Sequence, residues 1–506
     1  MYKIVIKPTH IEINNYNLGD CPKLENSFRL WNKATFTYYY KQIEYDENNK
    51  ILYVPRGIDI YYIEELFNVV SFYDNIVDRF EHNKSNTLIK YKPRDNKQIE
   101  ALKFLTSQGC YQYNKSSNQL MLSLNTGAGK TYLGIAYIAL MNLKSIIITE
   151  SNSWLEQWDE RIQEHSNITN REIYYIKGSP SILSLMKKTN EELSQYKIYL
   201  ITHSTISRFA SSNGWNSIRE LFIHLGIGIK IFDEAHLDFD NITKIDFHTN
   251  TLKTLYLTAT PAKGDEQENN IFRLYFKNIP KLILFDPNTD PHTNYLAIRY
   301  KSGLDMLEMS SCMNIHGFNK TAYCDQVIYK DNFDYILRIV MNILLKLPGK
   351  KLLFLATNKG VDFVYKWILA NYPEFNENTI GIFTSLNPNK ELALNCPLIL
   401  TTSKSAGAAV DIPRLTCSVQ LAEPIKSEPQ NRQRFGRTRE YNSLYIDLVD
   451  ESCSVTRKYY IGNLPMYEKY ALSVKETSFT QQELKNTAFK IMEDRMKHGI
   501  SPFYRI

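Results

Sequence analysis

The chain has 506 residues, of which 43% are apolar and 23% charged, and this globular composition excludes a disordered chain. The length allows roughly two to four domains with full hydrophobic cores, and no apolar run is long enough to cross a membrane. The formal net charge of +6 is compatible with a polyanionic partner but is too small to require one.

The seven cysteines are scattered along the chain, and none stands in a CxxC pair or a Cys/His cluster. The sequence therefore indicates neither a disulfide framework nor a zinc site. Residues 1–10 carry charges and lack the apolar segment of a signal peptide. We expect a soluble protein without a membrane partner in a reducing cytoplasm.

Residues 1–86 have the pattern of a small, separate α+β module. Short runs of alternating apolar and polar residues indicate strands, and a turn with Pro and Gly precedes a helical stretch. The predicted elements are strands within residues 1–13, 36–45 and 50–54, a turn at 55–57 and a helix over 60–73.

Aromatic and basic residues are mixed in this module. Rings beside positive charges could form a nucleic-acid surface that combines base stacking with phosphate contacts. Packing of the tyrosines in a small β core is the alternative, and the sequence favours it. The residues concerned are Lys33, Tyr38, Tyr39, Tyr40, Lys41 and Arg56.

From residue 91 onward, short apolar strands alternate with amphipathic helices, which is the pattern of a parallel α/β sheet. The first of these helices opens at residues 93–98, with Arg94 and Gln98, and continues to Leu105. An amide upstream of a phosphate loop can recognise adenine because it both donates and accepts, although a solvated helix position is the common role of Gln. Further strands are predicted at residues 120–124, 145–149, 198–204, 227–232 and 255–257, and a helix begins at 151–160.

The segment from Leu124 to Thr131 joins an apolar strand to an apolar-rich helical stretch. Its glycines allow backbone N–H groups to turn towards an anion, and the helix adds the positive end of its dipole. Lys130 would contact the β- and γ-phosphates and Thr131 would ligate Mg²⁺. A plain strand-to-helix turn is the alternative, because the strict pattern has glycine in place of Leu124. The nucleotide-binding candidates are Asn125, Thr126, Gly127, Ala128, Gly129, Lys130 and Thr131.

An acidic motif follows the strand at 227–232. Asp233 can hold Mg²⁺ through its water shell, and Glu234 can orient and deprotonate an attacking water. A chance match in a surface loop is the alternative, but the preceding strand and the phosphate loop favour catalysis. The next strand ends in residues 258–261, which could link the nucleotide site to another surface. The motif reads Asp233, Glu234, Ala235 and His236.

In this order, Gln98 and residues 127–131, 233–236 and 258–260 resemble the motifs of superfamily 2 DEAH-type DNA helicases. The resemblance covers about residues 90–450 and implies two tandem RecA-like domains. Residues 1–86 are similar in layout to the accessory domain of phage UvsW-like branch-migration helicases. The sequence thus predicts an α/β fold with two RecA-like parallel-sheet domains and a small α+β N-terminal domain.

The second half supports this resemblance. After an irregular stretch at residues 286–303, strands are predicted at 351–356 and 398–402 and a helix at 360–369. Residues 401–413 resemble the fifth motif of the superfamily and contribute Gly407 and Asp411 as nucleotide-binding candidates.

Residues 433–439 resemble the sixth motif and supply Gln433, Arg434, Arg437 and Arg439 as catalytic candidates. This half has no phosphate loop, so its arginines are interpreted as fingers that reach the γ-phosphate, with a solvated basic helix as the alternative. The last arginine of the family motif falls at Glu440 here. Either Arg439 takes its role from a shifted register, or Arg437 acts alone.

The resemblance implies ATP and Mg²⁺ as cofactors and an ATP-dependent DNA helicase or translocase that acts on branched or partly single-stranded DNA. It would unwind, anneal or migrate branches beside phage replication and recombination proteins, in the cytoplasm of a bacterial host. An RNA-dependent ATPase is an alternative, although Gln433, where many RNA helicases carry His, favours DNA. A DNA-binding motor subunit or clamp without unwinding activity is a third interpretation.

Phosphate contacts with DNA are expected at strand ends, where small hydroxyl residues precede helix N-termini, although such residues are also ordinary N-caps. The resemblance implies Ser151, Trp154, Gln157, His203, Ser204, Thr205, Thr357, Asn358, Thr401 and Thr402. The expected domains are residues 1–86 (accessory), 87–285 and 286–475 (motor domains) and 476–506 (helical extension).

Overall fold

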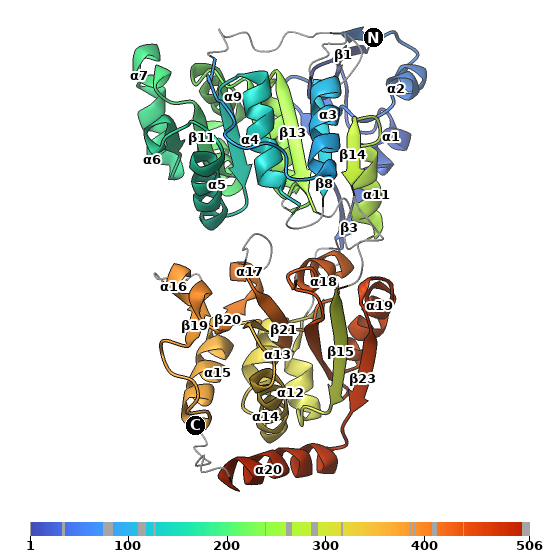
Figure 1. The fold of residues 1–506 in the computed structure, drawn as a ribbon. Helices are drawn as coiled ribbons and strands as arrows, with labels where there is room; N and C mark the ends of the chain where they lie inside the picture. The colour runs from blue at the N-terminus through green and yellow to red at the C-terminus, as the bar shows by residue number, and fades with distance from the viewer. Residues whose placement is uncertain are drawn as a thin grey trace. The chain divides into compact units, whose positions relative to one another are not determined.

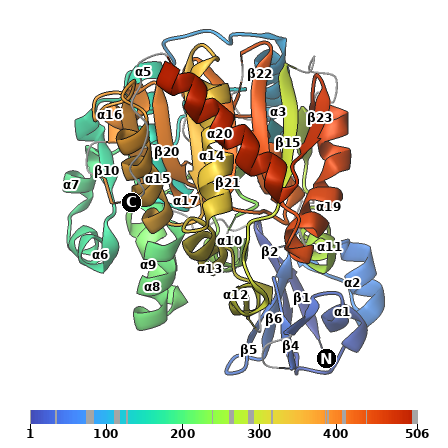
Figure 2. The same ribbon diagram turned by 90° about the horizontal axis from the view of Figure 1, so that it is seen from below.

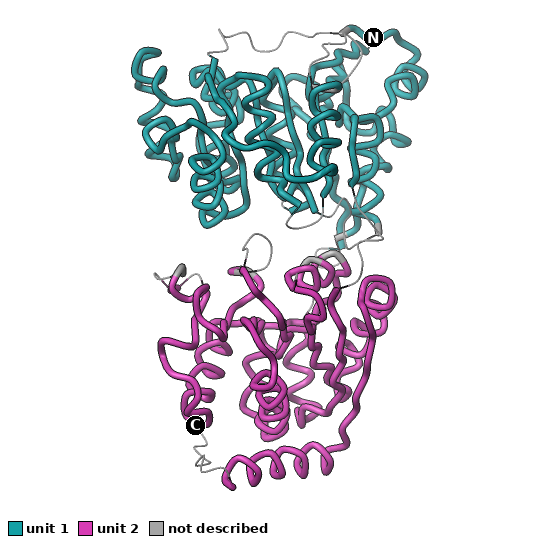
Figure 3. Tube along the Cα trace, in the orientation of Figure 1, with its two compact units in different colours: residues 1–286 teal, residues 287–506 magenta. Residues whose placement is uncertain are grey.

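The computed structural model divides the chain into two compact units, residues 1–286 and 287–506 (Figures 1 and 3). Among the described residues, no helix has the length and apolar composition needed to span a membrane. The structure describes residues 2–32, 36–73, 84–109, 118–124, 128–237, 239–259, 266–284, 292–314, 317–384, 386–387, 390–406, 412–438 and 440–497.

A small sheet forms the N-terminal module of the first unit (Figure 2). Ile4, Ile6, Ile11 and Ile13 alternate with more exposed residues and fill its core, which is why these segments pair as strands. Its strands, in order across the sheet, are β5 (Glu44–Asp46), β6 (Ile51–Pro55), β2 (His10–Asn14), β1 (Lys3–Ile6) and β7 (Phe72–Tyr73). The helices α1 (Pro22–Asn26) and α2 (Ile60–Phe67) and a hairpin of β3 (Arg29–Asn32) and β4 (Thr37–Tyr40) complete the module.

The helix predicted over residues 60–73 is shorter than expected. It ends at Phe67 because Asn68 takes a left-handed conformation, with φ 52°, and its N–H bonds back to the last turn. Phe72 and Tyr73 then pair in parallel with β1. The prediction was wrong here because apolar residues continue past a cap that periodicity does not reveal.

The module is anchored on the first parallel sheet domain. Ile271 of that domain belongs to the apolar core of the module. The Thr9 hydroxyl donates to the carbonyl oxygen of Asp246 at 2.8 Å, and the N–H of Asn278 donates to the carbonyl oxygen of Gly57 at 3.0 Å. The two regions therefore share a core and backbone contacts within one unit.

Within the described residues, the first parallel sheet has seven strands whose side chains are mostly buried on both faces. The helices α3, α4 and α5 pack side by side on one face (Figure 1), and α8, α9 and α10 pack on the other (Figure 2). In order the strands are β10 (Ile173–Tyr175), β11 (Ile198–Thr202), β9 (Ser145–Thr149), β12 (Ile229–Phe232), β13 (Lys253–Thr258), β8 (Gln119–Leu124) and β14 (Lys281–Leu284). The helices are α3 (Asn96–Gly109), α4 (Lys130–Met141), α5 (Asn152–His165), the short 3₁₀ turn η1 (Asn170–Glu172), α6 (Gly178–Met186), α7 (Asn190–Ser194), α8 (His203–Asn213), α9 (Trp215–His224), α10 (Phe239–His248) and α11 (Glu266–Tyr275).

A buried polar cluster lies in the core of this domain. Lys230 Nζ on β12 is 2.6 Å from Asp246 Oδ1 on α10, and both side chains are fully buried. The hydroxyl of Tyr275 donates to Asp246 Oδ2 at 2.6 Å, and the hydroxyl of Tyr256 donates to the same oxygen. A buried charge needs this degree of pairing, because an unpaired one would be costly.

The second unit contains another parallel sheet, again with seven strands among the residues that the structure describes. The core on one face is formed by α13, α14, α15 and α20, and Figure 2 shows α20 lying against α14. In order the strands are β19 (Ile380–Phe383), β20 (Leu398–Thr402), β18 (Lys350–Leu355), β21 (Leu415–Ala422), β22 (Ser443–Asp450), β15 (Thr293–Tyr300) and β23 (Val474–Ser478). The other elements are α12 (Met306–Ser311), β16 (Met313–Asn314), β17 (Gly317–Phe318), α13 (Lys320–Val327), α14 (Asp331–Leu345), α15 (Asn358–Asn371), α16 (Lys390–Asn395), α17 (Ser403–Ala406), α18 (Glu428–Phe435), α19 (Ser454–Tyr470) and α20 (Gln481–Lys497).

Two expectations for this unit need correction. The stretch at 286–303 is not irregular throughout, because β15 pairs with β22 over its full length. Residues from 476 onward are not purely helical, since β23 extends into them and pairs with β15, and Leu484 of α20 lies in the domain core. The predicted fold class, two RecA-like parallel-sheet domains with a small α+β N-terminal domain, is confirmed.

Candidate active site

The phosphate-loop lysine, the acidic motif and the segment after β13 meet at one edge of the first sheet. β8, β13 and β12 are parallel neighbours, so their carboxyl ends lie at the same edge. Lys130 begins α4 after β8, Asp233 and Glu234 follow β12, and Ala259 follows β13. Strand ends of this kind are where α/β sheets bind ligands.

Glu234 is the centre of this site. Its Oε1 accepts from Lys130 Nζ at 2.6 Å, and its Oε2 accepts from the backbone N–H of Ala259 at 3.1 Å. The two side chains are only 10% and 5% exposed. Burial alone would raise the pKa of Glu234, but Lys130 and His236 outweigh burial and hold it below its usual value. Glu234 is therefore an anion held between two motifs.

The backbone at Glu234 is unusual. Its φ of 48° is left-handed, a conformation that costs a non-glycine residue about 1 kcal/mol. His236 Nδ1 lies 2.9 Å from Thr258 Oγ1 and 3.4 Å from Glu234 Oε2. The acidic motif is thus tied to the end of β13 by side chains as well as by Ala259.

Asp233 is a buried carboxylate with a donor that the sequence did not reveal. The indole Nε1 of Trp158, on α5, donates to Asp233 Oδ2 at 2.8 Å. Burial, followed by the neighbouring Glu234, raises the pKa of Asp233 to about 6. Trp158 lies on the helix predicted at residues 151–160 and was not among the candidate site residues. A buried indole N–H needs an acceptor, and this need was the signal in the sequence from which a polar contact of Trp158 could have been inferred.

Gln98 is buried and contacts the phosphate loop, so the solvated helix position is excluded. Its Nε2 donates to the carbonyl oxygen of Ala128 at 3.1 Å, and its Oε1 accepts from the N–H of Arg94 at 2.8 Å. Gly129 has φ 88°, and a β-carbon there would lie 2.3 Å from Gln98 Nε2. The Arg94 side chain is exposed and pairs with Asp95 at 2.9 Å. Thr131 is half-buried in the first turn of α4, and Asn125, Thr126 and Gly127 lie outside the described residues.

The predicted nucleic-acid contacts of the first domain divide into two groups. The exposed Ser204 lies 3.1 Å, between hydroxyl oxygens, from the helix cap Thr202. Ser151 lies at the same sheet edge, because β9 and β11 are parallel neighbours. By contrast, His203 is fully buried and Trp154 is only 6% exposed, so burial argues against the expected contacts of these two side chains with DNA. The remaining candidates, Gln157 and Thr205, are half-buried.

In the second domain, the corresponding strand ends are β18 and β20, which are neighbours. Thr357 caps α15 by accepting from the N–H of Gly360 at 2.9 Å, and Asn358 is exposed beside it. Thr401 is buried and donates to the carbonyl oxygen of Phe383 at 2.6 Å, so its hydroxyl serves its own domain and the expected phosphate contact is not supported. Thr402 Oγ1 lies 3.1 Å from Ser405 Oγ, and Gly407 and Asp411 lie outside the described residues.

The two arginines of the sixth motif that the structure describes have different surroundings. Arg434 is buried on α18, where its Nη2 donates to Glu423 Oε2 at 2.7 Å and its Nη1 donates to Gln420 Oε1 at 3.2 Å. Lys320 also contacts Glu423, at 2.7 Å. Arg434 is therefore committed to its own domain. Arg437 is buried just beyond the end of α18, and Arg439 and the side chain of Gln433 lie outside the described residues.

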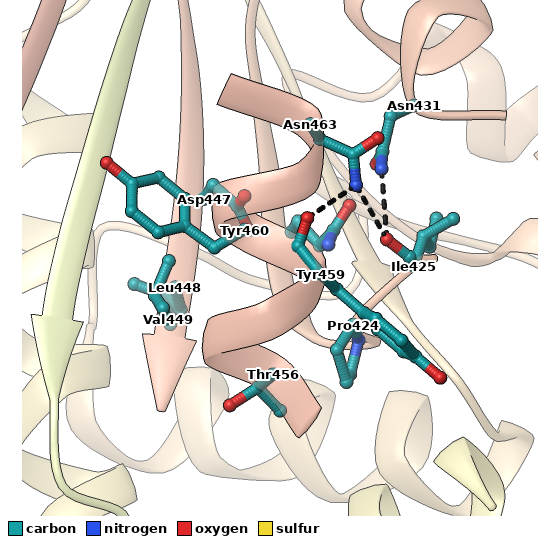
Figure 4. A pocket seen from close by; sticks show the side chains of 11 residues that line it. Pro424, Ile425, Asn431, Asp447, Leu448, Val449, Thr456, Tyr459, Tyr460 and Asn463 are labelled. Carbon is teal, nitrogen blue, oxygen red and sulfur yellow. Dashed lines mark hydrogen bonds between the residues drawn. The ribbon is translucent and has the colours of Figure 1, made fainter. Parts of the chain in front are cut away.

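A small cavity lies beside α18 and α19 (Figure 4). The side-chain amides of Asn431 and Asn463 both donate to the carbonyl oxygen of Ile425, each at 3.1 Å. Burial raises the pKa of Asp447, which also lines the cavity, to about 6. The volume of about 10 Å³ suits one water molecule and excludes a nucleotide.

Comparisons with known proteins agree with the motifs. Residues 90–263 match the family described as type III restriction enzyme, res subunit. The chain is 22% identical over 338 residues to the DNA 3'-5' helicase XPB of Mycobacterium tuberculosis, covering 62% of this chain and 53% of the relative. The chain thus spans about half the length of this curated relative.

Solved structures of similar fold include S. cerevisiae Dbp5 bound to RNA and ADP BeF3, with TM-score 0.49, 16% identity and coverage of 78% of this chain and 92% of that chain. Another is T4 UvsW, with TM-score 0.36, 14% identity and coverage of 94% and 99%. The family match includes Lys130, Asp233 and Glu234. Residues 90–263 are therefore similar to the type III restriction enzyme res subunit family.

Proposed function

We propose that the protein is an ATP-dependent DNA helicase or translocase that acts on branched or partly single-stranded DNA. The observation that carries the proposal is the contact of three motifs at one edge of the first sheet. Glu234 accepts from both Lys130 and the backbone of Ala259, so the phosphate loop, the acidic motif and the segment after β13 form one site. The similarity to a DNA 3'-5' helicase supports DNA as the substrate.

The residues at this edge fit ATP and Mg²⁺, because a lysine, a hydroxyl and two carboxylates supply the required donors and ligands. When bound, Mg·ATP supplies the bond to be hydrolysed and a divalent charge that neutralises its phosphates. Thr131 and Asp233 would hold the metal. Lys130 would exchange Glu234 for the phosphates, since both are anions that compete for its ammonium group.

This exchange would prepare Glu234 for catalysis. Lys130 lowers the pKa of Glu234. Its departure would raise that pKa and make the carboxylate a stronger base when water must be activated. The bond from Ala259 would keep Glu234 oriented throughout and would carry a change at the phosphates to residues 258–260.

We assign the arginine-finger role to Arg437. Arg434 is bound to Glu423 and Gln420, and withdrawing it would leave Glu423 buried with one partner fewer. Arg434 would therefore position α18, while Arg437 would stabilise the charge that develops on the γ-phosphate. Arg439 remains a second candidate from the sequence.

DNA would be gripped through its phosphates, with little sequence preference and a steep dependence on salt. Ser151, Ser204, Asn358 and Thr402 remain the strongest candidates for these contacts. The DEAH-type motif and the layout of residues 1–86 support a UvsW-like role in unwinding, annealing or branch migration. Such a role would place the protein with phage replication and recombination proteins in the cytoplasm of a bacterial host.

The test is ATP hydrolysis and strand displacement by the purified chain on forked DNA, single-stranded DNA, duplex DNA and RNA. Forked or single-stranded DNA should stimulate hydrolysis, and a labelled strand should be displaced only with ATP. The matched control, Lys130→Ala, should lose both activities because the phosphates lose their cation. Stimulation by RNA alone would identify an RNA-dependent ATPase, and stimulation without displacement would identify a clamp or a motor that does not unwind.

A further inference from the structure

The hairpin of β3 and β4 presents an aromatic surface, the aromatic strip, which consists of Arg29, Trp31, Phe36, Tyr38 and Tyr40. Trp31 is 41% exposed, Tyr38 is 56% exposed and Phe36, in the turn, is 76% exposed. The sequence favours packing of these tyrosines in a β core, but the structure places Tyr38, Tyr39 and Tyr40 among its exposed residues. The rings are therefore not buried in the core of this module.

Strand register places the strip on one face of the hairpin. Arg29 lies opposite Tyr40, and Trp31 lies opposite Tyr38. Residues directly opposite in an antiparallel pair project on the same side. Leu30, between Arg29 and Trp31, projects to the other side and is buried in the core of the module. One face of the hairpin thus packs on the core of the module, and the other face is open to solvent.

The strip is pre-organised by its own contacts. The ring centroids of Trp31 and Tyr38 are 4.7 Å apart in an edge-on arrangement, and the Arg29 guanidinium lies 3.7 Å from the Tyr38 ring centroid. The Tyr40 hydroxyl donates to Glu25 Oε2 at 2.9 Å. These contacts fix the rings in place, so little conformational entropy would be lost when a flat partner stacks on them.

The charge of the hairpin segment indicates a partner that carries phosphates. From Asn26 to Ile43 the sequence contains Arg29, Lys33 and Lys41 and no aspartate or glutamate. Lys41 is already paired with Glu268 at 2.6 Å, so Arg29 is the cation of the strip itself. An apolar protein partner needs no such absence of carboxylates, whereas a phosphate backbone with exposed bases needs both rings and positive charge.

We propose that the aromatic strip binds the unpaired bases of single-stranded nucleic acid, with rings stacking on bases and Arg29 contacting the backbone. Paired bases do not present their faces, so duplex DNA would not use this surface. The strip adds a base-stacking platform to the phosphate contacts of the two sheets. The proposal rests on the proposed function for its biological setting, while its chemistry can be tested by binding alone.

Intrinsic fluorescence tests it directly, because Trp154, Trp158 and Trp367 are buried and Trp31 is the most exposed tryptophan among the described residues. Oligo(dT) should quench the emission of the wild-type chain. Trp31→Phe should keep the affinity and lose most of the quenching, since phenylalanine still stacks. Trp31→Ala with Tyr38→Ala should weaken oligo(dT) binding, measured by anisotropy, by about 10-fold or more. Binding of oligo(rU) and of blunt duplex DNA is measured in the same assay.

Tyr61→Ala is the matched control, because Tyr61 is an exposed aromatic residue of the same module outside the strip. It should bind oligo(dT) like the wild type, and all variants should keep wild-type circular dichroism and DNA-independent ATP hydrolysis. Wild-type affinity in the double variant, equal weakening in Tyr61→Ala, or full quenching in Trp31→Phe would overturn the proposal. Failure of the proposed function would instead appear as wild-type ATP hydrolysis that no nucleic acid stimulates.

Discussion

The first sheet domain contains two lysine–carboxylate pairs with the same separation and different surroundings. Lys130 and Glu234 are 2.6 Å apart at the carboxyl edge of the sheet, and Lys230 and Asp246 are 2.6 Å apart in the core. Lys230 also donates to the carbonyl and hydroxyl oxygens of Thr249, at 2.9 and 2.8 Å. Lys130 contacts Glu234 alone among the described acceptors. Distance therefore does not distinguish a functional pair from a structural one.

The two pairs differ in how many of their hydrogen-bond donors and acceptors are already used by other groups. Every donor of the Lys230 ammonium is used, and two tyrosines occupy the partner carboxylate, so exchange would leave buried groups unpaired. Among the described residues, the Lys130 ammonium has unused donors, and it lies beside the predicted phosphate loop, so an incoming anion can replace Glu234. The Arg434 pair with Glu423 in the second domain is of the saturated, structural kind. Four predictions test this comparison.

The largest effect is expected for Glu234→Gln. The amide keeps the shape and loses the base, so kcat of DNA-stimulated ATP hydrolysis should fall by roughly 1,000-fold or more. Nucleotide binding, measured with a fluorescent ATP analogue, should persist. The nearly isosteric Asp246→Asn should keep its kcat wherever it remains folded. Wild-type turnover in Glu234→Gln would remove this residue from the role of base.

Arg437→Ala extends the comparison to the second domain. If Arg437 is the finger, kcat should fall by about 1,000-fold while the affinity for ATP changes little. Arg434→Ala should instead lower the melting temperature, because it leaves Glu423 buried with Lys320 as its remaining ion-pair partner among the described residues. Steady-state kinetics and thermal unfolding measure the two effects. A change confined to KM in Arg437→Ala would indicate a binding residue.

Asp246→Asn should be the most destabilising change at the two lysine pairs. It leaves a fully buried ammonium without its anion, at a cost of about 3 kcal/mol in the free energy of unfolding. Glu234→Gln should cost less, because the Lys130 side chain keeps 10% of its surface exposed, whereas Lys230 is fully buried. Urea unfolding followed by circular dichroism compares the two variants. Equal losses would contradict the distinction between saturated and exchangeable pairs.

The smallest effect concerns pH. Asp233 has a pKa of about 6, so as the pH falls through 6 it gains a proton and loses the charge that would hold Mg²⁺. The KM for Mg·ATP should rise below this pH. Trp158→Phe removes a donor that favours the carboxylate, raises the pKa of Asp233 and should move this acid limb to higher pH by a few tenths of a unit.

Trp154→Phe is the control for this prediction, because Trp154 is buried on the same helix and forms no hydrogen bond with Asp233 among the described residues. Its pH profile of KM should match that of the wild type. A shift of the same size in both variants would mean that repacking of α5, and not the lost N–H donor, moves the acid limb.

Local sequence patterns were sufficient to locate the site, but they did not predict the contacts between its side chains. The strands β8, β9, β12 and β20 and the helix at Lys130 were predicted because apolar runs end at turn or polar motifs. The strand β15 was missed because Asp-Pro pairs nearby signal irregular structure, whereas its pairing with β22 comes from a distant segment. Pairing of this kind depends on tertiary structure.

The same limit applies to individual side chains. The sequence pointed to Glu234 and Lys130 by their motifs, but no periodicity predicts that Trp158 donates to Asp233 or that Arg434 is bound by Glu423. Trp154 and Thr401 were expected at the DNA surface because the resemblance implied it, and their burial depends on which way each helix and strand faces. For the tyrosines of the hairpin, the sequence favoured packing in a β core over an exposed surface. This preference was wrong, because composition does not show which face of a strand is covered.

One small residue governs how the N-terminal module is joined to its neighbour. A β-carbon on Gly57 would lie 1.8 Å from the carbonyl oxygen of Tyr275, where no atom fits without displacement of the backbone. The side chain of alanine at this position would push the module away from the end of α11. The hairpin and the first parallel sheet would then be displaced relative to each other, although the residues of both would be unchanged.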